Sequence, residues 1–302
     1  MIQNLCLNFS PFLIIICVLT LFIQSHRSSY NDAFYQKNQR TSNALKNDSI
    51  NKVFKNQVFN PNSKYAFATL TTPAFCMGAI ALGHTLTKYH GSKYDLICLV
   101  TPDINETWIK ILSQWWRVVK VPNYKPFKGF RRSWAKVFLW DLTEYEKVVY
   151  FDTDMIVVGP LDELFTYNQL SCVPDTASPQ ICNSGVLVIQ PKDGTTENMQ
   201  KTAKKTKLLF GIGDQGFINS YFGRFTPLPS RYNVPRTQGS SFGWAYDNNI
   251  TRVIHYVCKK PWKCGREGVG YCGCGYPSFN VLWWSVFDEA CRNHECIESW
   301  AE

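Results

Sequence analysis

Between residues 65 and 151 the chain alternates short apolar runs with longer amphipathic segments, and this alternation constrains its fold more than any other feature. The short runs carry the β-branched and aromatic residues typical of strands, and the longer segments carry apolar residues at helical spacing. The predicted strands are residues 65–70, 95–100, 118–121 and 148–151, and the predicted helices are residues 75–89, 108–116 and 134–142. Such alternation predicts an α/β domain built on a doubly wound parallel sheet.

The second half of the chain is predicted to add a strand at residues 185–189 and a lysine-rich helix near residues 196–210. With 302 residues, 45% of them hydrophobic, the chain can form one large domain or two small ones with a sizeable core. The net charge of +9 is modest, so we expect no nucleic-acid partner. Anionic small molecules and an anionic membrane surface are both compatible with that charge.

The N-terminal segment is predicted to direct the chain into the secretory pathway. Residues 11–23 read PFLIIICVLTLFI, which is short for a membrane span and about right for the core of a signal peptide. Residues 1–24 are therefore either a signal anchor, the interpretation we favour because no small-residue cleavage site follows, or a cleaved signal peptide. Positive charge lies after the segment rather than before it, which favours cleavage.

Both interpretations place the rest of the chain in the secretory lumen, anchored by a single membrane pass if the segment is uncleaved and secreted if it is cleaved. Residues 25–62 are rich in Asn, Ser, Gln and Lys and predict a flexible stem. Tripeptides at Asn47, Asn105 and Asn249 match the glycosylation sequon, a weak signal. The sequence says nothing about the oligomeric state.

Cysteine usage fits the same compartment. The chain has 12 cysteines, and six gather near the C-terminus. They are Cys258, Cys264, Cys272, Cys274, Cys291 and Cys296. An even cluster in a lumenal protein is explained most simply by disulfides, with a zinc site as the alternative, and the pairing cannot be deduced from sequence. We expect residues 263–302 to form a disulfide-rich C-terminal extension.

The tripeptide Asp152-Thr153-Asp154 directly follows the fourth predicted strand. Ionised carboxylates rarely follow a buried strand unless something neutralises them, because desolvating an unpaired charge costs free energy. Side chains two residues apart in an extended chain point to the same side, so both aspartates can hold one cation. They would do so at the carboxyl end of the strand, where ligands bind in open α/β sheets. A surface turn with two solvated acids is the alternative.

A histidine completes the candidate metal site. His255 follows the apolar residues Val253 and Ile254, and it is either a plain hydrogen-bonded residue or a third ligand beside the two aspartates. Two carboxylates and an imidazole suit Mn²⁺, since imidazole binds manganese better than magnesium. Lys260 lies close enough in the sequence to reach a phosphate on the same metal.

Two further patterns need an interpretation. Residues 211–216 match the G-x-G-x-x-G dinucleotide pattern, but a predicted helix precedes them and no acidic residue lies near position 236. We therefore reject a dinucleotide site, and with it a nicotinamide oxidoreductase. Between Glu106 and Asp141 the chain has basic and aromatic residues and no acidic one. That stretch is a solvated loop, a lid over an anionic donor, or a platform for an acceptor.

Taken together, the motifs resemble glycosyltransferase family 8, the glycogenin-like enzymes. The likeness spans roughly residues 64–262 and rests on five motifs in the family's order. They are residues 67–72 with Gly78, residues 148–154, residues 183–186, residues 213–216, and His255-Tyr256 with Lys260-Pro261-Trp262. The resemblance implies a GT-A fold over residues 63–262, with a Rossmann-like mixed sheet and flanking helices. It also implies a UDP-sugar donor, retention of anomeric configuration, and a glycan, protein or lipid acceptor for a hexosyl-type sugar.

The resemblance also assigns roles to individual residues. Asp152, Asp154 and His255 would ligate Mn²⁺. Asp214 and Gln215 would lie near the anomeric carbon, with Asp214 as the charged stabiliser, whether the mechanism is covalent or proceeds by attack from the leaving-group face. The donor-binding residues would be Leu70, Thr71, Thr72, Phe75, Lys136, Asp152, Thr153, Asn183, Ser184, Gly185 and Lys260.

The chain departs from the glycogenin pattern in three places. Cys258 replaces the glycine usual after the histidine, which predicts either a negative φ or a strained backbone in that segment. The N-terminal apolar segment and the cysteine-rich tail are extra, and they suggest a member that works in the Golgi lumen. The rival hypothesis is a catalytically inactive relative that binds carbohydrate or a partner, and the intact site residues argue against it.

Overall fold

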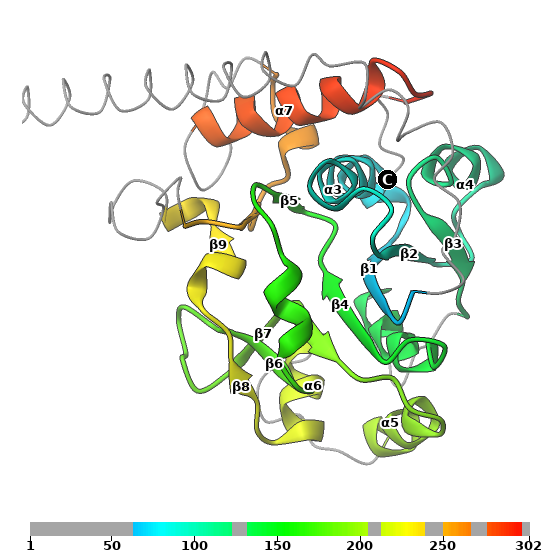
Figure 1. Ribbon diagram of the computed structural model, residues 1–302, viewed down its shortest axis with the longest axis vertical. Helices are drawn as coiled ribbons and strands as arrows, with labels where there is room; N and C mark the ends of the chain where they lie inside the picture. The colour runs from blue at the N-terminus through cyan, green and yellow to red at the C-terminus, as the bar shows by residue number, and fades with distance from the viewer. Residues whose placement is uncertain (1–62, 123–131, 205–212, 239–249, 267–276, 298–302) are drawn as a thin grey trace, which may run out of the picture. The chain divides into compact units, whose positions relative to one another are not determined.

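The computed structural model of the chain describes residues 63–122, 132–204, 213–238, 250–266 and 277–297 (Figure 1). The predicted signal segment, the predicted stem and residues 123–131 of the basic stretch lie outside these ranges. None of the helices in the described part of the chain is both long enough and apolar enough to cross a membrane.

A seven-stranded mixed sheet in the order β3-β2-β1-β4-β7-β6-β8 forms the centre of the described chain. Its strands are β1 (Tyr65–Thr71), β2 (Asp95–Val100), β3 (Arg117–Lys120), β4 (Lys147–Phe151), β6 (Ser171–Pro174), β7 (Cys182–Ile189) and β8 (Thr226–Pro227). The first four are parallel, as the strand–helix alternation predicted. Strand β7 runs antiparallel to both β4 and β6. The alternation alone was therefore wrong for the second half, whereas the resemblance correctly implied a mixed sheet.

A second, smaller sheet joins the aspartate tripeptide to the histidine. It has the order β5-β10-β9 and consists of β5 (Met155–Val157), β10 (Val253–His255) and β9 (Val234–Pro235). Strand β10 runs antiparallel to β5, with His255 opposite Met155. The backbone N–H of Tyr256 donates to the carbonyl of Asp154 over 2.7 Å. This pairing carries His255 to the end of β4, about a hundred residues earlier in the chain.

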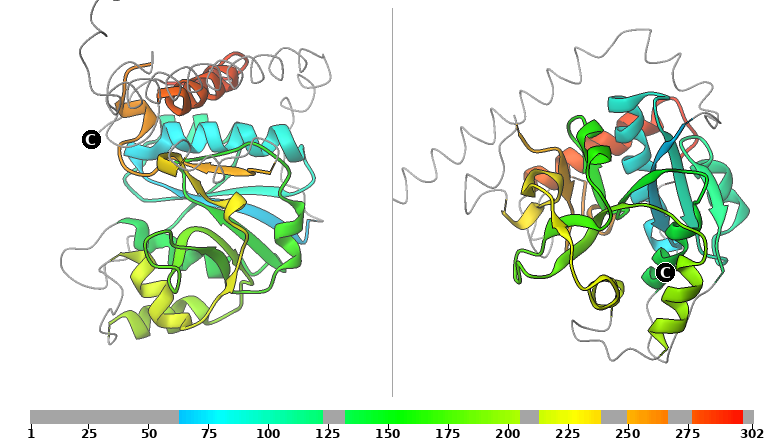
Figure 2. Two further views of the ribbon diagram at one scale, coloured as in Figure 1. Left: turned by 90° about the vertical axis from the view of Figure 1, so that its left-hand side faces the viewer. Right: turned by 60° about the horizontal axis from the view of Figure 1, so that its bottom comes forward.

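Helices cover both faces of the large sheet (Figure 2). The helices are α3 (Cys76–His90), α4 (Glu106–Leu112), α5 (Thr195–Ala203), α6 (Asp214–Phe222) and α7 (Pro277–Cys291), with a 3₁₀ segment η2 (Arg132–Asp141). One face carries α3 and α7, and the other carries η2, α5 and α6. The predicted helix at residues 134–142 is thus a 3₁₀ segment. Helix α4 ends four residues earlier than predicted, because Trp116 turns inward and donates to the carbonyl of Ala79.

Alternate residues of β1 build the two halves of the core. Ala66, Ala68 and Leu70 face the cluster formed with η2, α5 and α6. Phe67 points to the other side, where its ring lies 5.2 Å from that of Tyr94. Because both faces of the strand are covered, its apolar residues run continuously rather than alternating with polar ones, as expected for a parallel strand between helical layers.

The C-terminal segment packs against the first helix of the domain. Lys88 of α3 and Glu289 of α7 form an ion pair of 3.0 Å, and Nε2 of His84 lies 3.6 Å from the same carboxylate. The rings of Trp262 and Trp283 lie 5.2 Å apart. The predicted C-terminal extension, residues 263–302, therefore contributes helix α7 to the body of the fold. The boundary between the extension and the GT-A domain at residues 262 and 263 stays a prediction.

Disulfides are present at the C-terminal cysteines that the structure describes. Cys291 is bonded to Cys296. Cys258 and Cys264 are also disulfide-bonded, and Cys272 and Cys274 lie outside the described residues. A further disulfide, Cys172–Cys182, joins β6 to β7. The sequence did not indicate this bond, because Cys172 and Cys182 lie apart from the C-terminal cluster of cysteines.

The Glu289 carboxylate predicts how stability depends on acidity. Burial raises its pKa, but the contacts with His84 and Lys88 outweigh burial and lower the pKa from 4.5 to about 2. A folded-state pKa below the unfolded value stabilises the fold above pH 4.5, and this contribution is lost as the pH falls toward 2. Glu289→Gln should lower the free energy of unfolding at neutral pH by ~2 kcal/mol. It should also flatten the decline of stability in that acid range, as measured by urea denaturation.

Glu295→Gln is the matched control for this experiment. Glu295 pairs with Lys110 over 2.9 Å, but its side chain is 67% exposed. Exposed pairs contribute little because water screens them. The Glu295 variant should therefore unfold like the parent at every pH, and an unchanged acid profile in the Glu289 variant would contradict the assignment.

Candidate active site and metal centre

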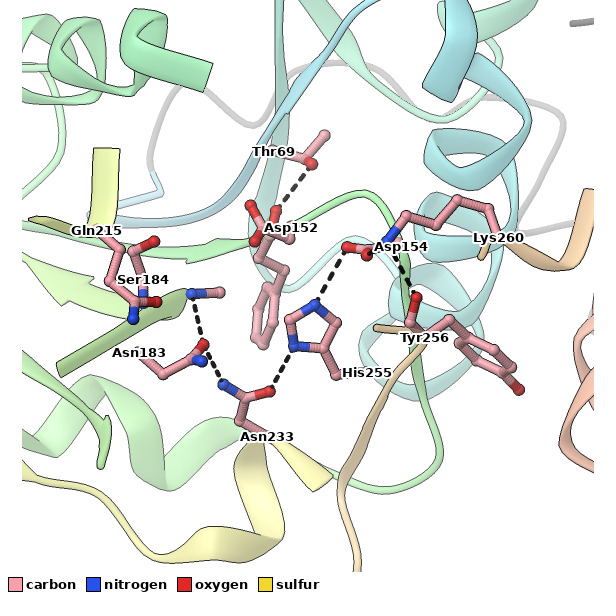
Figure 3. A network of polar contacts seen from close by, with 12 residues as sticks. Thr69, Asp152, Asp154, Asn183, Ser184, Gln215, Asn233, His255, Tyr256 and Lys260 are labelled. Carbon is pink, nitrogen blue, oxygen red and sulfur yellow. Dashed lines mark hydrogen bonds and ion pairs between the residues drawn. The ribbon is translucent and has the colours of Figure 1, made fainter. Parts of the chain in front are cut away.

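Three side chains converge at the carboxyl end of β4 (Figure 3). Asp152 follows β4, Asp154 precedes β5, and His255 ends β10. One ligand atom from each lies within 4.8 Å of the others. Nε2 of His255 is 3.4 Å from Oδ1 of Asp154, and both residues are buried. The two sheets thus bring together the aspartates and the histidine that the sequence offered as ligands.

A chain of amides sets the state of the His255 ring (Figure 3). The backbone N–H of Gly185, which can only donate, reaches Oδ1 of Asn183 over 3.0 Å. That same oxygen accepts from Nδ2 of Asn233 over 2.8 Å, so Oδ1 of Asn233 faces Nδ1 of His255 at 2.9 Å. Nδ1 therefore donates to Asn233, and Nε2 is the ring nitrogen that faces Asp154. Two carboxylates and an imidazole nitrogen held in this way fit a divalent cation, which would bind Nε2 in place of a proton.

Asn233 is a site residue that sequence reasoning missed. It is 4% exposed and lies just before β9. An asparagine between a tyrosine and a valine carries no sequence signal of its own. Its role becomes visible only when β9 pairs with β10 and places it beside His255.

Lys260 contacts the metal-site carboxylate. Its ammonium group forms an ion pair with Asp154 and donates to the carbonyl of Tyr256 over 3.1 Å. Burial alone would raise the pKa of Asp154, but the attraction and hydrogen bonds of His255 and Lys260 outweigh it and hold that pKa well below its usual range. Asp154 is therefore ionised, as a metal ligand must be.

A buried lysine connects the aspartate tripeptide to α6. Lys136, on η2, has a side chain only 4% exposed, and its Nζ lies 2.9 Å from Asp152 and 2.6 Å from Asp214. Burial opposes its charge, but the two carboxylates outweigh burial and raise the pKa of Lys136. For Asp214, burial would raise the pKa, but Lys136 and a hydrogen bond from Ser184 lower it. Lys136 and Asp214 are therefore both charged.

The first turn of α6 and the start of β7 bring polar side chains together. The hydroxyl of Ser184 donates to Asp214 over 2.9 Å, and its backbone N–H donates to Oε1 of Gln215 over 3.2 Å. Helix α6 begins at Asp214, after Gly213 at its N-cap, so the glycine motif opens a helix that favours a carboxylate at its first turn. Asn183 lies next to Ser184, and the candidates Asn183, Ser184, Asp214 and Gln215 are therefore together.

Asp175 lies beside the same polar side chains, and the sequence analysis did not identify it as a site residue. Its Oδ2 accepts hydrogen bonds from Nδ2 of Asn183 over 3.0 Å and from Nε2 of Gln215 over 3.2 Å. Burial raises the pKa of Asp175, but the hydrogen bond from Asn183 and others outweigh it and lower the pKa. A carboxylate directly after an apolar strand is the signal that singled out Asp152, and it would have found Asp175 too.

The candidates at the end of β1 are less exposed to a ligand. Leu70 is buried, and Thr71 is 0% exposed, with its hydroxyl directed to the carbonyl of Thr72. Thr72 and Phe75 are partly exposed. The Phe75 ring lies edge-on to Trp262 at 5.8 Å and 5.9 Å from the Lys260 ammonium. Phe75 therefore borders the site, whereas the Thr71 side chain lies within the core.

Gly78 and Gly185, two glycines of the family motifs, lie so close to neighbouring residues that no side chain fits there. A Cβ at Gly78 would overlap the carbonyl of Thr153 and lie 2.8 Å from the Trp262 ring. A Cβ at Gly185 would lie 2.9 Å from Cε1 of His255. Any other residue would push the aspartate tripeptide or the histidine out of place, because real Cβ contacts are not that short.

Of the two backbone conformations that the sequence allowed at Cys258, a negative φ or a strained backbone, the structure has the strained one. Its φ is 66°, in the left-handed region that favours glycine. The following carbonyl, of Lys259, accepts a hydrogen bond from the guanidinium of Arg236, which is 1% exposed. The segment thus keeps a backbone suited to glycine while it carries a disulfide-bonded cysteine.

Comparison with solved structures identifies the fold. The glycosyltransferase GlyE of Streptococcus pneumoniae TIGR4 matches with a TM-score of 0.58 and 20% identity, over 75% of this chain and 60% of GlyE. The galactosyltransferase LgtC, solved in complex with donor and acceptor sugar analogues, matches with a TM-score of 0.57 and 17% identity, over 77% of this chain and 97% of LgtC. The fold is that of the GT-A glycosyltransferases.

Sequence comparison is more specific. The model of glycosyl transferase family 8 matches residues 67–264. Human glycogenin-1 is 30% identical over 253 residues, covering 74% of this chain and 71% of glycogenin-1. A putative UDP-glucuronate:xylan alpha-glucuronosyltransferase 5 of Arabidopsis thaliana is 30% identical over 75% of this chain, which spans only 42% of that relative. The chain belongs to glycosyltransferase family 8.

The buried ion pairs of Lys136 predict a measurable coupling. Lys136→Met removes the cation and leaves the carboxylates of Asp152 and Asp214 without a neutralising charge, so it should lower the free energy of unfolding by ~3 kcal/mol. Adding Asp214→Asn removes one of the two stranded charges and should restore part of that loss. Urea denaturation of the single and double variants measures the coupling.

Lys64→Met is the control for Lys136→Met, because it breaks an ion pair with Glu146 in which both side chains are more than half exposed. We expect no measurable change in that variant. Strictly additive effects of the Lys136 and Asp214 changes would show that the two charges do not interact.

Proposed function

We propose that this protein is a metal-dependent, retaining glycosyltransferase that moves a hexosyl sugar from a UDP-sugar to a glycan, protein or lipid acceptor. The convergence of Asp152, Asp154 and His255 on one point, next to the Lys136–Asp214 pair, is the observation that carries the proposal. The family of the chain supports the reaction class, and the donor set supports Mn²⁺ as the cation.

In this proposal the chain's own residues divide the work. Mn²⁺ held by the two aspartates and His255 supplies positive charge to the diphosphate leaving group. Lys260, whose ammonium is paired with Asp154, would be able to contact a phosphate once that carboxylate held the cation. Leu70, Thr71, Thr72 and Phe75 would border the uridine, Thr71 through its backbone because its side chain is buried, and the remaining donor-binding candidates would face the sugar and diphosphate.

Asp214 is the candidate for stabilising positive charge at the anomeric carbon. Its carboxylate is ionised beside Lys136 and fixed by Ser184, so it is pre-organised rather than free to turn away. Gln215 is held between Ser184 and Asp175 and would orient the sugar. The same arrangement serves a covalent intermediate or an attack from the leaving-group face.

We also propose a secretory-lumen location. Several described cysteines are disulfide-bonded, which suits an oxidising compartment. Residues 1–24 as an anchor or signal peptide, residues 25–62 as a stem and a Golgi setting complete this proposal. Epitope tagging and protease protection of isolated microsomes would test it.

Substitution of the aspartates tests the proposed chemistry. Asp152→Asn or Asp154→Asn replaces an anionic ligand by a neutral one of the same shape, so release of UDP from a UDP-sugar in the presence of Mn²⁺ should fall by about 10²-fold or more. Asp193→Asn changes an exposed carboxylate before α5 and should leave the rate unchanged. Full activity in either site variant would refute the mechanism. A parent protein that binds no UDP with Mn²⁺ would instead favour the inactive relative.

The charge of the pocket predicts which donor sugars it accepts. Asp152 and Asp214 both pair with Lys136, and Asp175 accepts a hydrogen bond from Gln215, the neighbour of Asp214. A uronate would add a negative charge beside three carboxylates, and Lys136, the cation that the described residues place between two of them, is already paired, so we propose a neutral hexose. UDP-glucose should bind about tenfold more tightly than UDP-glucuronate in calorimetric titrations with Mn²⁺.

Asp175→Asn should narrow that ratio, because it removes one negative charge but keeps the shape of the side chain. Both affinities will fall, since the amide accepts fewer hydrogen bonds, and the ratio is therefore the informative quantity. Asp193→Asn should leave the ratio as it is. Tighter binding of UDP-glucuronate by the parent protein would exclude a neutral donor.

A further inference from the structure

The disulfide Cys172–Cys182 spans the turn that carries the proposed sugar-binding residues. The two cysteines are ten residues apart in the sequence and 0% exposed. Asp175 begins the turn one residue after β6 ends, and Asn183 follows Cys182 directly. The bond therefore ties together the two strands from which Asp175 and Asn183 project into the pocket.

The ladder between β6 and β7 is irregular at this end of the hairpin. The register shifts between Cys172 and Pro174, so the ladder is interrupted where the turn begins. Within the turn, the N–H of Asp175 donates to the carbonyl of Ile181 over 2.8 Å, and two shorter-range backbone bonds join Ser178 to Asp175 and Ile181 to Ser178. The disulfide lies at this irregularity and supplies the constraint that the ladder lacks.

Each cysteine is in turn anchored to a different part of the fold. Oδ1 of Asn219, on α6, accepts from the N–H of Cys182 over 2.8 Å, and its Nδ2 donates to the carbonyl of Cys182 over 2.9 Å. The carbonyl of Cys172 accepts from the N–H of Leu228 over 2.8 Å. The bond thus connects α6, which carries Asp214 and Gln215, to the edge of the large sheet.

The metal ligands stand on other elements. Asp152 and Asp154 flank the junction of β4 and β5, and His255 ends β10, whose neighbours are β5 and β9. Neither cysteine belongs to those strands, and Asn183 reaches His255 through Asn233 rather than directly. Loss of the disulfide should therefore disturb the contacts of the sugar before it disturbs those of the cation.

We propose that the Cys172–Cys182 disulfide is a positioning device for the donor sugar, which keeps Asp175, Asn183 and Ser184 in register with Gln215. This inference rests on the proposed function for the identity of the ligand. It makes the bond a determinant of affinity for the sugar moiety and not for the nucleotide.

The test compares three variants of the full chain. Cys172→Ala/Cys182→Ala removes the bond, Cys291→Ala/Cys296→Ala removes the described C-terminal bond, and Cys98→Ala removes a buried sulfur that makes no disulfide. Calorimetric titration with Mn²⁺ measures the Kd of UDP and of UDP-glucose for each. In the first variant the Kd of UDP-glucose should rise by about fivefold or more, while that of UDP stays within about twofold. The other two variants should match the parent.

Hydrogen–deuterium exchange gives a readout that needs no ligand. Residues 175–185 should exchange faster in the Cys172→Ala/Cys182→Ala protein, and residues 147–157 should keep their protection. Equal weakening of UDP and UDP-glucose, or unchanged affinity for both, would overturn the inference, as would unchanged exchange of the turn. A parent protein that binds neither compound would refute the proposed function, and the exchange result would still decide whether the bond orders the turn.

Discussion

The candidate site depends first on the buried ammonium of Lys136. It lies between Asp152, at the end of β4, and Asp214, at the start of α6, and its side chain is 4% exposed. Without a cation, two carboxylates from distant segments would repel each other at this partly buried position. The free energy needed to desolvate them would exceed the free energy gained by packing. With the lysine between them, the strand end and the helix start approach closely enough for Ser184 to hydrogen-bond both Asp214 and Gln215.

A second line of contacts runs from this pocket to the candidate metal ligands. Asp175 accepts from Asn183, Asn183 accepts from Asn233, and Asn233 orients His255. Each amide is fixed at both ends, so the ring of His255 has one favoured proton arrangement. The sugar-binding candidates and the metal site are therefore parts of one polar network, although His255 belongs to the smaller sheet and Asn183 to the larger one. The disulfide between β6 and β7 lies at the pocket end of that network.

The local sequence pattern predicted the structure correctly wherever a feature depends on the residues of a single helix or strand. The strands of the parallel half, the helix of residues 76–90 and the position of Asp152 and Asp154 after β4 all followed from periodicity and residue type. The 3₁₀ form of residues 132–141 did not follow, because a helical pattern of apolar residues does not distinguish the two helix types. The strand at residues 185–189 was predicted, but local pattern did not give its antiparallel direction, since the direction of a strand depends on its connections and not on its own residues.

By itself the sequence determined the α/β class, the motifs of the family and the carboxylates at the strand ends. These features depend on side chains a few positions apart, whose spacing sets which face they occupy. Only the tertiary structure decided which distant residues meet: His255 with Asp154, Lys136 with Asp214, Asn233 with His255 and Cys172 with Cys182. Such meetings arise from strand order, register and the closure of two sheets, and no local spacing encodes them.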